Sequence, residues 1–251
     1  MSKPFDAKLE ILADPAALSL RVAEWLLEMA TAKAGVFAVC LSGGSTPKRL
    51  YQHLAEPPYR EMFPWPRTHW FWGDERFVPY DDVLSNYRMV RYALLSRAPI
   101  PAGNIHPMPT EGLSPEAAAF AYERTLRSFY GAERLDPARP LFDVTLLGLG
   151  PDGHIASLFP GTTVLAERDR WVAALVETKA EPRITLTYPA LESSRNIAFL
   201  VAGKEKRAIL GRLCRGDDSL PAAHLRPVGS LRIFADEAAG MEVMKDERRE
   251  P

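Results

Sequence analysis

Short apolar segments alternate with segments of helical pattern along most of the chain, and this alternation restricts the fold more than any other feature of the sequence. The runs with the composition of buried strands are residues 36–41, 69–72, 142–147, 171–176, 184–187, 196–201 and 231–235. Helical spacing follows Asp14 and Pro15, which suit the cap and the first position of a helix. This order predicts an α/β fold, with a mostly parallel sheet and helices on both faces.

The composition is that of one globular domain. Of the 251 residues, 47% are hydrophobic and 25% are charged, which is enough to bury a full core. No stretch rich in glycine, serine or proline divides the chain, so we expect a single α/β domain over residues 1–251, with a charged end from about residue 245 that frays. Cys40 and Cys214 have no metal-ligand spacing, and we expect both to be buried free thiols.

Charge and hydropathy restrict the partners. A formal net charge of -1 gives no electrostatic reason to expect nucleic acid or an anionic membrane, so a small molecule is the expected partner. Residues 1–10 lack the apolar core of a signal peptide, and no apolar run approaches the ~18 residues of a membrane span. We therefore expect a cytoplasmic protein that is a monomer or a weak homodimer.

The strand-like run at residues 142–147 leads directly into glycines and then into an Asp-Gly-His sequence. In an open parallel sheet, ligands bind beyond the carboxyl ends of the strands, where Gly148, Gly150 and Gly153 let the backbone turn tightly. Asp152 and His154 are therefore expected to face a pocket, and His154 is the first candidate catalyst. The alternative is a loop histidine whose hydrogen bonds are satisfied locally.

A second motif, Ser42-Gly43-Gly44-Ser45-Thr46-Pro47, joins a strand to a short helix. Free amides at a helix start, with Ser45 or Thr46 as cap and Pro47 in the first helical position, are typical of an anion site, and phosphate fits it. The alternative is a tight turn in which the hydroxyl groups only cap the helix. Two cations at the ends of later strands, Arg183 and Lys204, favour phosphate, although each alone is more typical of a solvated surface charge.

The third motif is Gly73-Asp74-Glu75-Arg76, followed by Ser85-Asn86-Tyr87. Adjacent acidic and basic residues can form a surface salt-bridge cluster that contributes little to stability. The preceding strand, however, contains Trp70 and Trp72 and is expected to be deeply buried, so its end opens into the same crevice as His154. Both interpretations can hold together, with Asp74 or Glu75 positioning Arg76.

Taken together, the three motifs resemble those of the 6-phosphogluconolactonase family. The matching segments are Leu-Ser-Gly-Gly-Ser-Thr-Pro at 41–47, Trp-Gly-Asp-Glu-Arg at 72–76 with Ser-Asn-Tyr at 85–87, and Gly-Leu-Gly-Pro-Asp-Gly-His-Ile-Ala-Ser-Leu-Phe-Pro at 148–160. Their order and spacing match over nearly the whole chain. The resemblance implies hydrolysis of 6-phospho-D-glucono-1,5-lactone to 6-phosphogluconate in the oxidative pentose phosphate pathway, without a metal or an organic cofactor. It also implies a fold like that of the glucosamine-6-phosphate deaminase group, an α/β fold with a Rossmann-like, mostly parallel sheet.

The resemblance also assigns roles to residues. It gives the phosphate to the turn at 42–46 together with Arg183 and Lys204, and it gives His154 the role of general base. Arg76 becomes a stabiliser of substrate charge. We count Asp74 with the catalytic residues and Asn86 with those that bind the substrate.

These roles agree with the chemistry of lactone opening. An imidazole with an ordinary pKa of ~6.5 is partly neutral at cellular pH, so His154 can take a proton from water and pass it to the leaving ring oxygen. Asp152 is placed to hold the imidazole tautomer. Arg76, or the backbone amides near Gly150 and Gly153, are candidates to stabilise the oxyanion.

Two other functions compete with this interpretation. In the related aldosamine-6-phosphate isomerases and deaminases, a Phe-Asn-Glu sequence follows the histidine, and its carboxylate assists ring opening. Ser157-Leu158-Phe159 occupies that stretch here, which favours hydrolysis. A non-catalytic sugar-phosphate sensor would need an additional interaction module, for which the chain has no room, and would not require the Asp-Gly-His sequence.

Overall fold

The centre of the molecule is a seven-stranded sheet with the order β1-β10-β9-β6-β2-β3-β5, in which the neighbouring strands pair in parallel. A computed structural model describes residues 5–176 and 180–247 of the chain. The strands of this sheet are β1 (Lys8–Leu12), β2 (Phe37–Leu41), β3 (Thr68–Trp72), β5 (Ile105–His106), β6 (Val144–Leu147), β9 (Asn196–Val201) and β10 (Ser230–Asp236). The parallel sheet predicted from the sequence is confirmed.

A second, antiparallel sheet has the order β4-β8-β7. Its strands are β4 (Asp74–Arg76), β7 (Val172–Leu175) and β8 (Arg183–Leu186). The expectation that residues 171–176 and 184–187 belong to the parallel sheet is therefore wrong. Strand β4 directly follows β3 after Gly73, so this small sheet continues from the carboxyl end of the large one.

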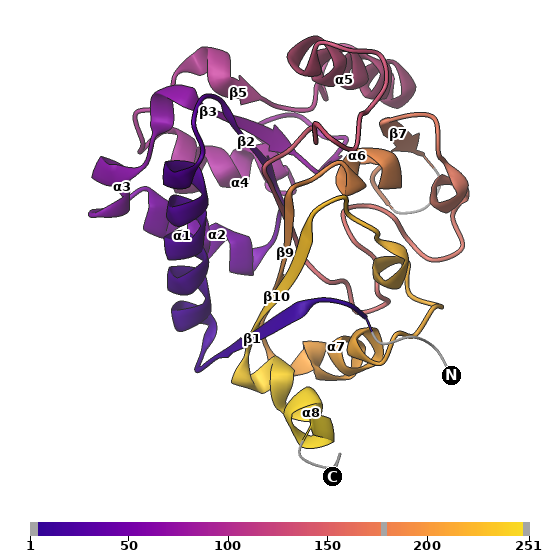
Figure 1. Ribbon diagram of the computed structural model, residues 1–251. Helices are drawn as coiled ribbons and strands as arrows, with labels where there is room; N and C mark the ends of the chain where they lie inside the picture. Colours follow the sequence, from indigo (N-terminus) through magenta and orange to yellow (C-terminus); the bar gives the residue numbers. More distant parts are fainter. Residues whose placement is uncertain (1–4, 177–179, 248–251) are drawn as a thin grey trace.

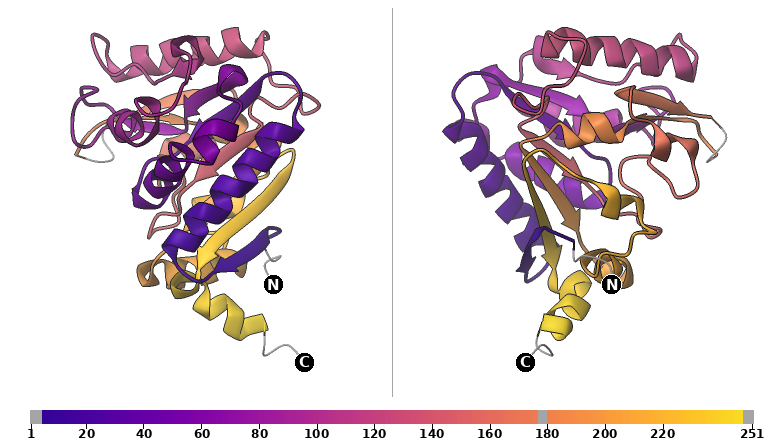
Figure 2. Two further views of the ribbon diagram at one scale, coloured as in Figure 1. Left: turned by 90° about the vertical axis from the view of Figure 1, so that its left-hand side faces the viewer. Right: turned by 45° about the vertical axis from the view of Figure 1, so that its right-hand side comes forward.

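Helices cover both faces of the large sheet (Figures 1 and 2). The helices are α1 (Pro15–Ala32), α2 (Ser45–Leu54), α3 (Tyr59–Met62), α4 (Asn86–Val90), α5 (Pro115–Tyr130), α6 (Tyr188–Glu192), α7 (Arg207–Cys214) and α8 (Glu237–Glu247). The shorter helical turns are η1 (Trp65–Arg67), η2 (Arg91–Leu95), η3 (Ala102–Asn104), η4 (Thr163–Ala166), η5 (Lys204–Lys206) and η6 (Pro221–His224). Helix α1 crosses one face together with α2, whereas α6 and α7 lie on the other side.

The helix start at Asp14 is confirmed: its carboxylate accepts hydrogen bonds from the amides of Ala16 and Ala17, both at 2.8 Å. Inward-facing side chains of α1 pack on the sheet, as Trp25 does against Phe234 of β10, with ring centres 5.5 Å apart. All five residues of β2 are buried, because helices cover both sides of the sheet. The buried apolar side chains of the described residues form one continuous cluster.

Three local expectations need correction. Strand β1 was not anticipated; it lies at the edge of the sheet, where Lys8 is exposed and the other four residues are only partly buried. Helix α2 begins at Ser45, and Gly44, with φ of 105°, is its cap, so neither hydroxyl group caps the helix and Pro47 is its third residue. Helix α8 extends to Glu247, so part of the predicted fraying end is helical, and residues 248–251 lie outside the described residues.

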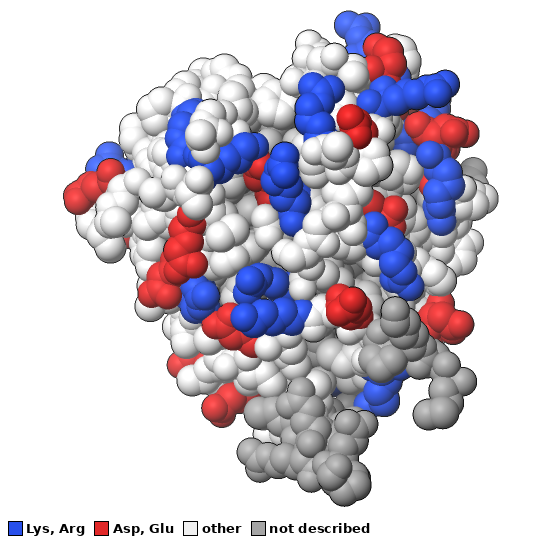
Figure 3. Space-filling model, in the orientation of Figure 1, with Lys and Arg blue, Asp and Glu red and all other residues white. Residues whose placement is uncertain are grey.

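Charges of both signs are interspersed over the face of the molecule seen in Figure 3. In the part of the chain that the structure describes, no helix combines the length and the hydropathy needed to cross a membrane. The cytoplasmic location expected from the sequence stays a prediction.

Candidate active site

A cavity of about 330 Å³ lies at the carboxyl ends of β2, β3, β6 and β9, where the topology of a parallel sheet places ligand sites. Its volume is at the lower end of the roughly 300–1,000 Å³ typical of small-molecule sites. The residues that line it are Ser42, Gly43, Gly44, Ser45, Thr46, Pro47, Asp74, Arg76, Asn86, Gly148, Leu149, Gly150, Pro151, His154, Ala156, Leu200, Ala202, Glu205 and Lys206. The three sequence motifs therefore meet in one place.

Residues 42–46, which we call the anion cradle, form one wall of the cavity. The cradle is fixed from behind by Tyr51 of α2, whose hydroxyl accepts a hydrogen bond from the Ser42 amide at 3.0 Å and donates to the Ser42 carbonyl at 2.8 Å. Helix α2 has no side-chain cap, so the amides of its first residues, Ser45 and Thr46, have no partner within the helix. Such amides, at the positive end of the helix dipole, suit an anion.

His154 reaches the cavity from the loop after β6, and its Nδ1 lies 2.5 Å from Oδ1 of Asp152. The ring packs so closely on Gly150 that a Cβ atom there would lie 2.0 Å from Nδ1, so only glycine fits at residue 150. Phe159 supports the ring from another side, with centres 4.5 Å apart. Partial burial raises the pKa of Asp152, but the hydrogen bonds and charge of His154 outweigh burial, and the pKa lies below its usual value.

Arg76 and Asn86 are held together beside the anion cradle. Nη1 of Arg76 donates to Oδ1 of Asn86 at 2.7 Å and to the Leu84 carbonyl at 3.0 Å, while Nδ2 of Asn86 donates to the Asp74 carbonyl at 2.9 Å. Asn86 packs directly on Gly43, where a Cβ atom would lie 2.0 Å from its Oδ1. The sequence prediction that these two residues share a site with the cradle is consistent with this geometry.

Asp74 faces the cavity and is tied to the His154 loop. Its Oδ2 accepts a hydrogen bond from the Ser157 hydroxyl at 2.7 Å, and the Ser157 amide donates to Oγ1 of Thr185 on β8 at 3.1 Å. Between His154 and Ser157, Ala156 has φ of 48°, a left-handed conformation that is uncommon for alanine. Ser157 is fully buried, so this contact fixes the loop from inside the protein. The sequence did not single out Ser157.

Lys204 and Arg183 do not line the cavity, contrary to the converging cations expected from the sequence. After β9, Gly203 has φ of 99° and its amide donates to the Asp236 carboxylate, which starts the turn η5; Lys204 is exposed. Lys206 lines the cavity instead, and its Nζ donates to the Leu149 carbonyl at 2.7 Å. Only the turn geometry decides between these two lysines, so the sequence alone could not.

Arg183 on β8 lies opposite Arg76 on β4 in the register of the small antiparallel sheet. Its Nη2 lies 3.6 Å from a Glu181 carboxylate oxygen. Burial, reinforced by the charge of Arg76, lowers the pKa of Arg183. The residue therefore belongs to the charge environment of Arg76 rather than to the cavity wall.

The oxyanion role expected of the backbone amides near Gly150 and Gly153 can be tested against the hydrogen bonds of this loop. The amide of Gly150 donates to the His154 carbonyl at 2.9 Å and that of Gly153 to the Gly150 carbonyl at 3.0 Å, so these two amides are not available to an oxyanion. Among residues 5–176 and 180–247, no group of three or more His, Cys, Asp or Glu residues is arranged to hold a metal ion.

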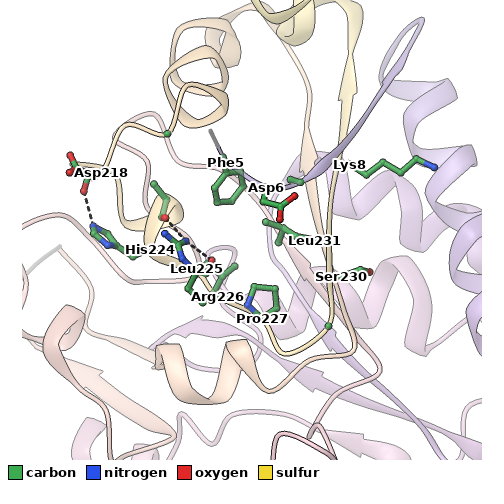
Figure 4. Close-up of a pocket in the computed structure, with 14 residues that line it drawn as sticks. Phe5, Asp6, Lys8, Asp218, His224, Leu225, Arg226, Pro227, Ser230 and Leu231 are labelled. Atoms are coloured by element: carbon green, nitrogen blue, oxygen red, sulfur yellow. Dashed lines mark hydrogen bonds between the residues drawn. The ribbon is translucent and has the colours of Figure 1, made fainter. Parts of the chain in front are cut away.

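A larger cavity of about 720 Å³ lies at the amino ends of β1 and β10, the opposite edge of the sheet (Figure 4). Two of its polar side chains, those of His224 and Arg226, are engaged with backbone carbonyls. The ring of His224 lies 2.7 Å from the Asp218 carbonyl, and Nη1 of Arg226 donates to the carbonyls of Ala223 and Leu225. We therefore place the candidate active site in the smaller cavity, where the polar groups converge.

Asp152, which was expected to face the pocket, does not line the cavity and contacts it only through His154. Fold and site together define a class: α/β proteins in which an anion cradle at a helix start shares a cavity with a histidine that is paired with an aspartate. The family model described as glucosamine-6-phosphate isomerases/6-phosphogluconolactonase matches residues 13–233, so the chain belongs to this family. The chain is 43% identical over 214 residues to a 6-phosphogluconolactonase of Synechocystis sp., covering 84% of this chain and 86% of that protein.

Two further comparisons extend over more of the chain. A 6-phosphogluconolactonase of Nostoc sp. is 40% identical over 242 residues, which cover 94% of this chain and 98% of the relative. The crystal structure of 6-phosphogluconolactonase from Thermotoga maritima superposes with a TM-score of 0.79 at 35% identity, covering 92% of this chain and all of that one.

Proposed function

We propose that the protein hydrolyses 6-phospho-D-glucono-1,5-lactone to 6-phospho-D-gluconate. The observation that carries the proposal is the cavity itself, in which His154, paired with Asp152, and the anion cradle line one space of hexose-phosphate scale. Family membership and the names of the relatives agree with it. A place in the oxidative pentose phosphate pathway follows from this substrate.

His154 acts as the general base. With Nδ1–H donating to Asp152, Nε2 keeps its lone pair and can take a proton from water as the water attacks the lactone carbonyl. The C1–ring-oxygen bond then breaks, and the same proton can pass from Nε2 to the leaving oxygen. Asp152 stabilises the imidazolium formed between these two steps, because its pKa is lowered and its carboxylate stays charged.

The cradle, Lys206 and Arg76 hold the substrate phosphate. The unpaired amides of α2 are available to the anion, and Lys206 lines the same cavity. Arg76 joins them because Asn86, which accepts its hydrogen bond, is packed against Gly43 of the cradle. Lys206 thus takes the role that was expected of Lys204.

The stretch after the histidine favours hydrolysis over isomerisation or deamination. Ser157 and Leu158 are fully buried and Phe159 nearly so, and none of the three carries an acid. Opening a sugar ring and moving a proton between adjacent carbons calls for a further acid–base group there, whereas lactone hydrolysis does not.

A coupled assay with freshly prepared lactone, corrected for its spontaneous opening, tests the function. We expect turnover of the phosphorylated lactone and much poorer turnover of gluconolactone. His154→Ala should lower kcat roughly 10²- to 10⁴-fold without unfolding the protein. Near-normal kcat in this variant would remove His154 from the mechanism, and turnover of glucosamine 6-phosphate in place of the lactone would favour the deaminase alternative.

Paired lysine variants test the phosphate site. Lys206→Ala should raise KM roughly tenfold or more, since a hydrogen bond to a charged group contributes about 1.5 to 3 kcal/mol. Lys204→Ala is the matched control: it removes the same side chain two residues away, where the lysine is exposed and outside the cavity. Equal effects of the two changes on KM would contradict the assignment.

A further inference from the structure

Glu75 is a buried carboxylate directly behind the site, with 1% of its surface exposed, and it does not line the cavity. Its Oε1 accepts hydrogen bonds from the amides of Arg76 at 2.8 Å and Asn86 at 2.7 Å. Its Oε2 accepts from the Tyr87 amide at 2.7 Å and from the Ser85 hydroxyl at 3.3 Å. One side chain thus joins β4 to the start of α4.

We propose that Glu75 is a positioning residue that fixes the Arg76 guanidinium beside the anion cradle. Glu75 holds Arg76 at two points. The first is direct, through the Arg76 amide. The second runs through Asn86. The Asn86 amide donates to Glu75, and the Asn86 side chain accepts a hydrogen bond from Nη1 of Arg76 at 2.7 Å. The proposal rests on the proposed function in that Arg76 holds the substrate phosphate.

A role limited to capping α4 does not account for these contacts. Ser85 already caps the helix, with its hydroxyl accepting the Arg88 amide at 3.1 Å. Glu75 adds the bond to Arg76, which lies outside the helix, and thereby sets the distance between β4 and α4. Asn86 also packs on Gly43, so a shift of α4 would displace both the arginine and the wall of the cradle.

Burial and hydrogen bonds have opposite effects on the pKa of Glu75. Burial raises its pKa to about 7, although the amides of Asn86, Tyr87 and Arg76 act in the opposite direction, and the neighbouring Asp74 adds to the rise. Arg183 and Tyr80 also interact electrostatically with it. The charged form of Glu75 is thus stabilised by the same backbone amides that the side chain holds in place.

Glu75→Gln is the sharpest test, because it keeps the size and shape of the side chain. Each carboxylate oxygen accepts at least one backbone amide, so either orientation of the glutamine places its NH₂ group against an N–H. We expect KM for the phosphorylated lactone, and the dissociation constant of inorganic phosphate measured by calorimetry, to rise roughly five- to twenty-fold, with kcat changed less.

Glu123→Gln is the matched control. Glu123 is also a buried carboxylate that accepts two backbone amides, those of Trp171 at 3.0 Å and Val172 at 3.2 Å, but it lies on α5 and outside the cavity. The variant Glu123→Gln should lower Tm as Glu75→Gln does, but its KM and phosphate affinity should stay within about twofold of the wild-type values. If both variants change phosphate affinity equally, or neither does, Glu75 has no positioning role.

A double-mutant cycle with Arg76→Ala separates positioning from general damage. If Glu75 acts through Arg76, Glu75→Gln should add no further loss of phosphate affinity in the Arg76→Ala background. Additive losses would overturn the proposal.

Phosphate binding needs no turnover, so a protein that binds phosphate as expected but lacks lactonase activity would refute the proposed function alone. Should Glu75→Gln fail to fold, Asn86→Ala, which removes the side-chain link to Arg76 together with the hydrogen bond to the Asp74 carbonyl, should reproduce the loss of affinity. Wild-type affinity in that variant would overturn the proposal.

Discussion

The carboxylate of Asp74 lines the cavity at the front and is held at the back by the Ser157 hydroxyl, at 2.7 Å. Ser157→Ala would leave this nearly buried carboxylate without that donor. We expect a loss of about 1 to 3 kcal/mol in the free energy of unfolding, and a several-fold fall in kcat/KM because the orientation of Asp74 is loosened. Urea unfolding and the lactonase assay measure the two effects.

Ser194→Ala provides the control for Ser157→Ala. Ser194 is equally buried and its hydroxyl lies 2.8 Å from Oγ1 of Thr145 and donates to the Leu191 carbonyl, but it does not line the cavity. Its loss should cost comparable stability and leave kcat/KM unchanged at a temperature where both variants are folded. A similar fall in kcat/KM in both would mean that the contact with Asp74 has no specific role.

At the residue scale, sequence reasoning found the side chains that follow strand ends and missed those placed by turns. His154, Asp74 and the cradle come directly after apolar strands, and the topology of a parallel sheet brings such positions together. The choice between Lys204 and Lys206 depends on the turn at Gly203, and the contact between Ser157 and Asp74 joins residues 83 positions apart. Neither is encoded in a local pattern.

At the scale of elements, the same distinction separates the strands. The buried strands β2, β3, β6 and β9 were predictable because continuous apolar runs are typical of a sheet covered on both faces. Strand β4 consists of Asp-Glu-Arg and has no apolar signal, and its pairing with β8 is set by tertiary contacts. The edge strand β1 carries charged residues at 8 and 10, which hid it from a search for apolar runs.

The pairing of β3 with β5 brings together two histidines and gives a pH prediction. Nδ1 of His69 lies 2.9 Å from Nε2 of His106, and Phe129 of α5 packs on both rings. Burial lowers the pKa of both, and in His106 burial and the charge of His69 lower it to about 4. The unfolded chain takes up these protons near pH ~6.5, so stability is complete above that value and falls as the pH drops toward the folded pKa.

We expect the pair to account for about 1 to 2 kcal/mol of the stability lost between pH 7 and pH 4.5, after allowance for partial exposure. Urea unfolding at several pH values should show a shallower slope for His106→Gln than for the wild type. His224→Gln, which changes an exposed histidine bonded to the Asp218 carbonyl, should keep the wild-type slope. Identical slopes for all three proteins would show that folding does not lower the pKa of these two histidines.

At the scale of the whole molecule, the two ends of the strands in the large sheet have different roles; we call them the carboxyl edge and the amino edge. Converging cavity residues lie at the carboxyl ends of the strands, whereas an ion-pair cluster around the buried Asp143 lies at the amino ends. Asp143, beside β6, accepts the Ala38 amide at 2.8 Å, lies 2.5 Å from Nζ of Lys33 and 3.4 Å from Nε of Arg195. It links β2, the end of α1 and the start of β9, so it acts on the fold and not on the site.

The same substitution at the two edges should therefore have opposite consequences. Asp143→Asn keeps the shape but removes a buried charge from two cations, and we expect Tm to fall by about 5 to 10 °C with kcat/KM unchanged where the variant is folded. Asp152→Asn removes a half-exposed carboxylate, so Tm should change little, while kcat falls roughly 10²- to 10⁴-fold because the imidazole loses its tautomer partner. Thermal unfolding and the lactonase assay on both variants measure the contrast. Loss of activity in folded Asp143→Asn, or a large fall in Tm for Asp152→Asn, would mean that stability and catalysis are not divided between the edges, and that the cavity depends on the amino edge for its shape.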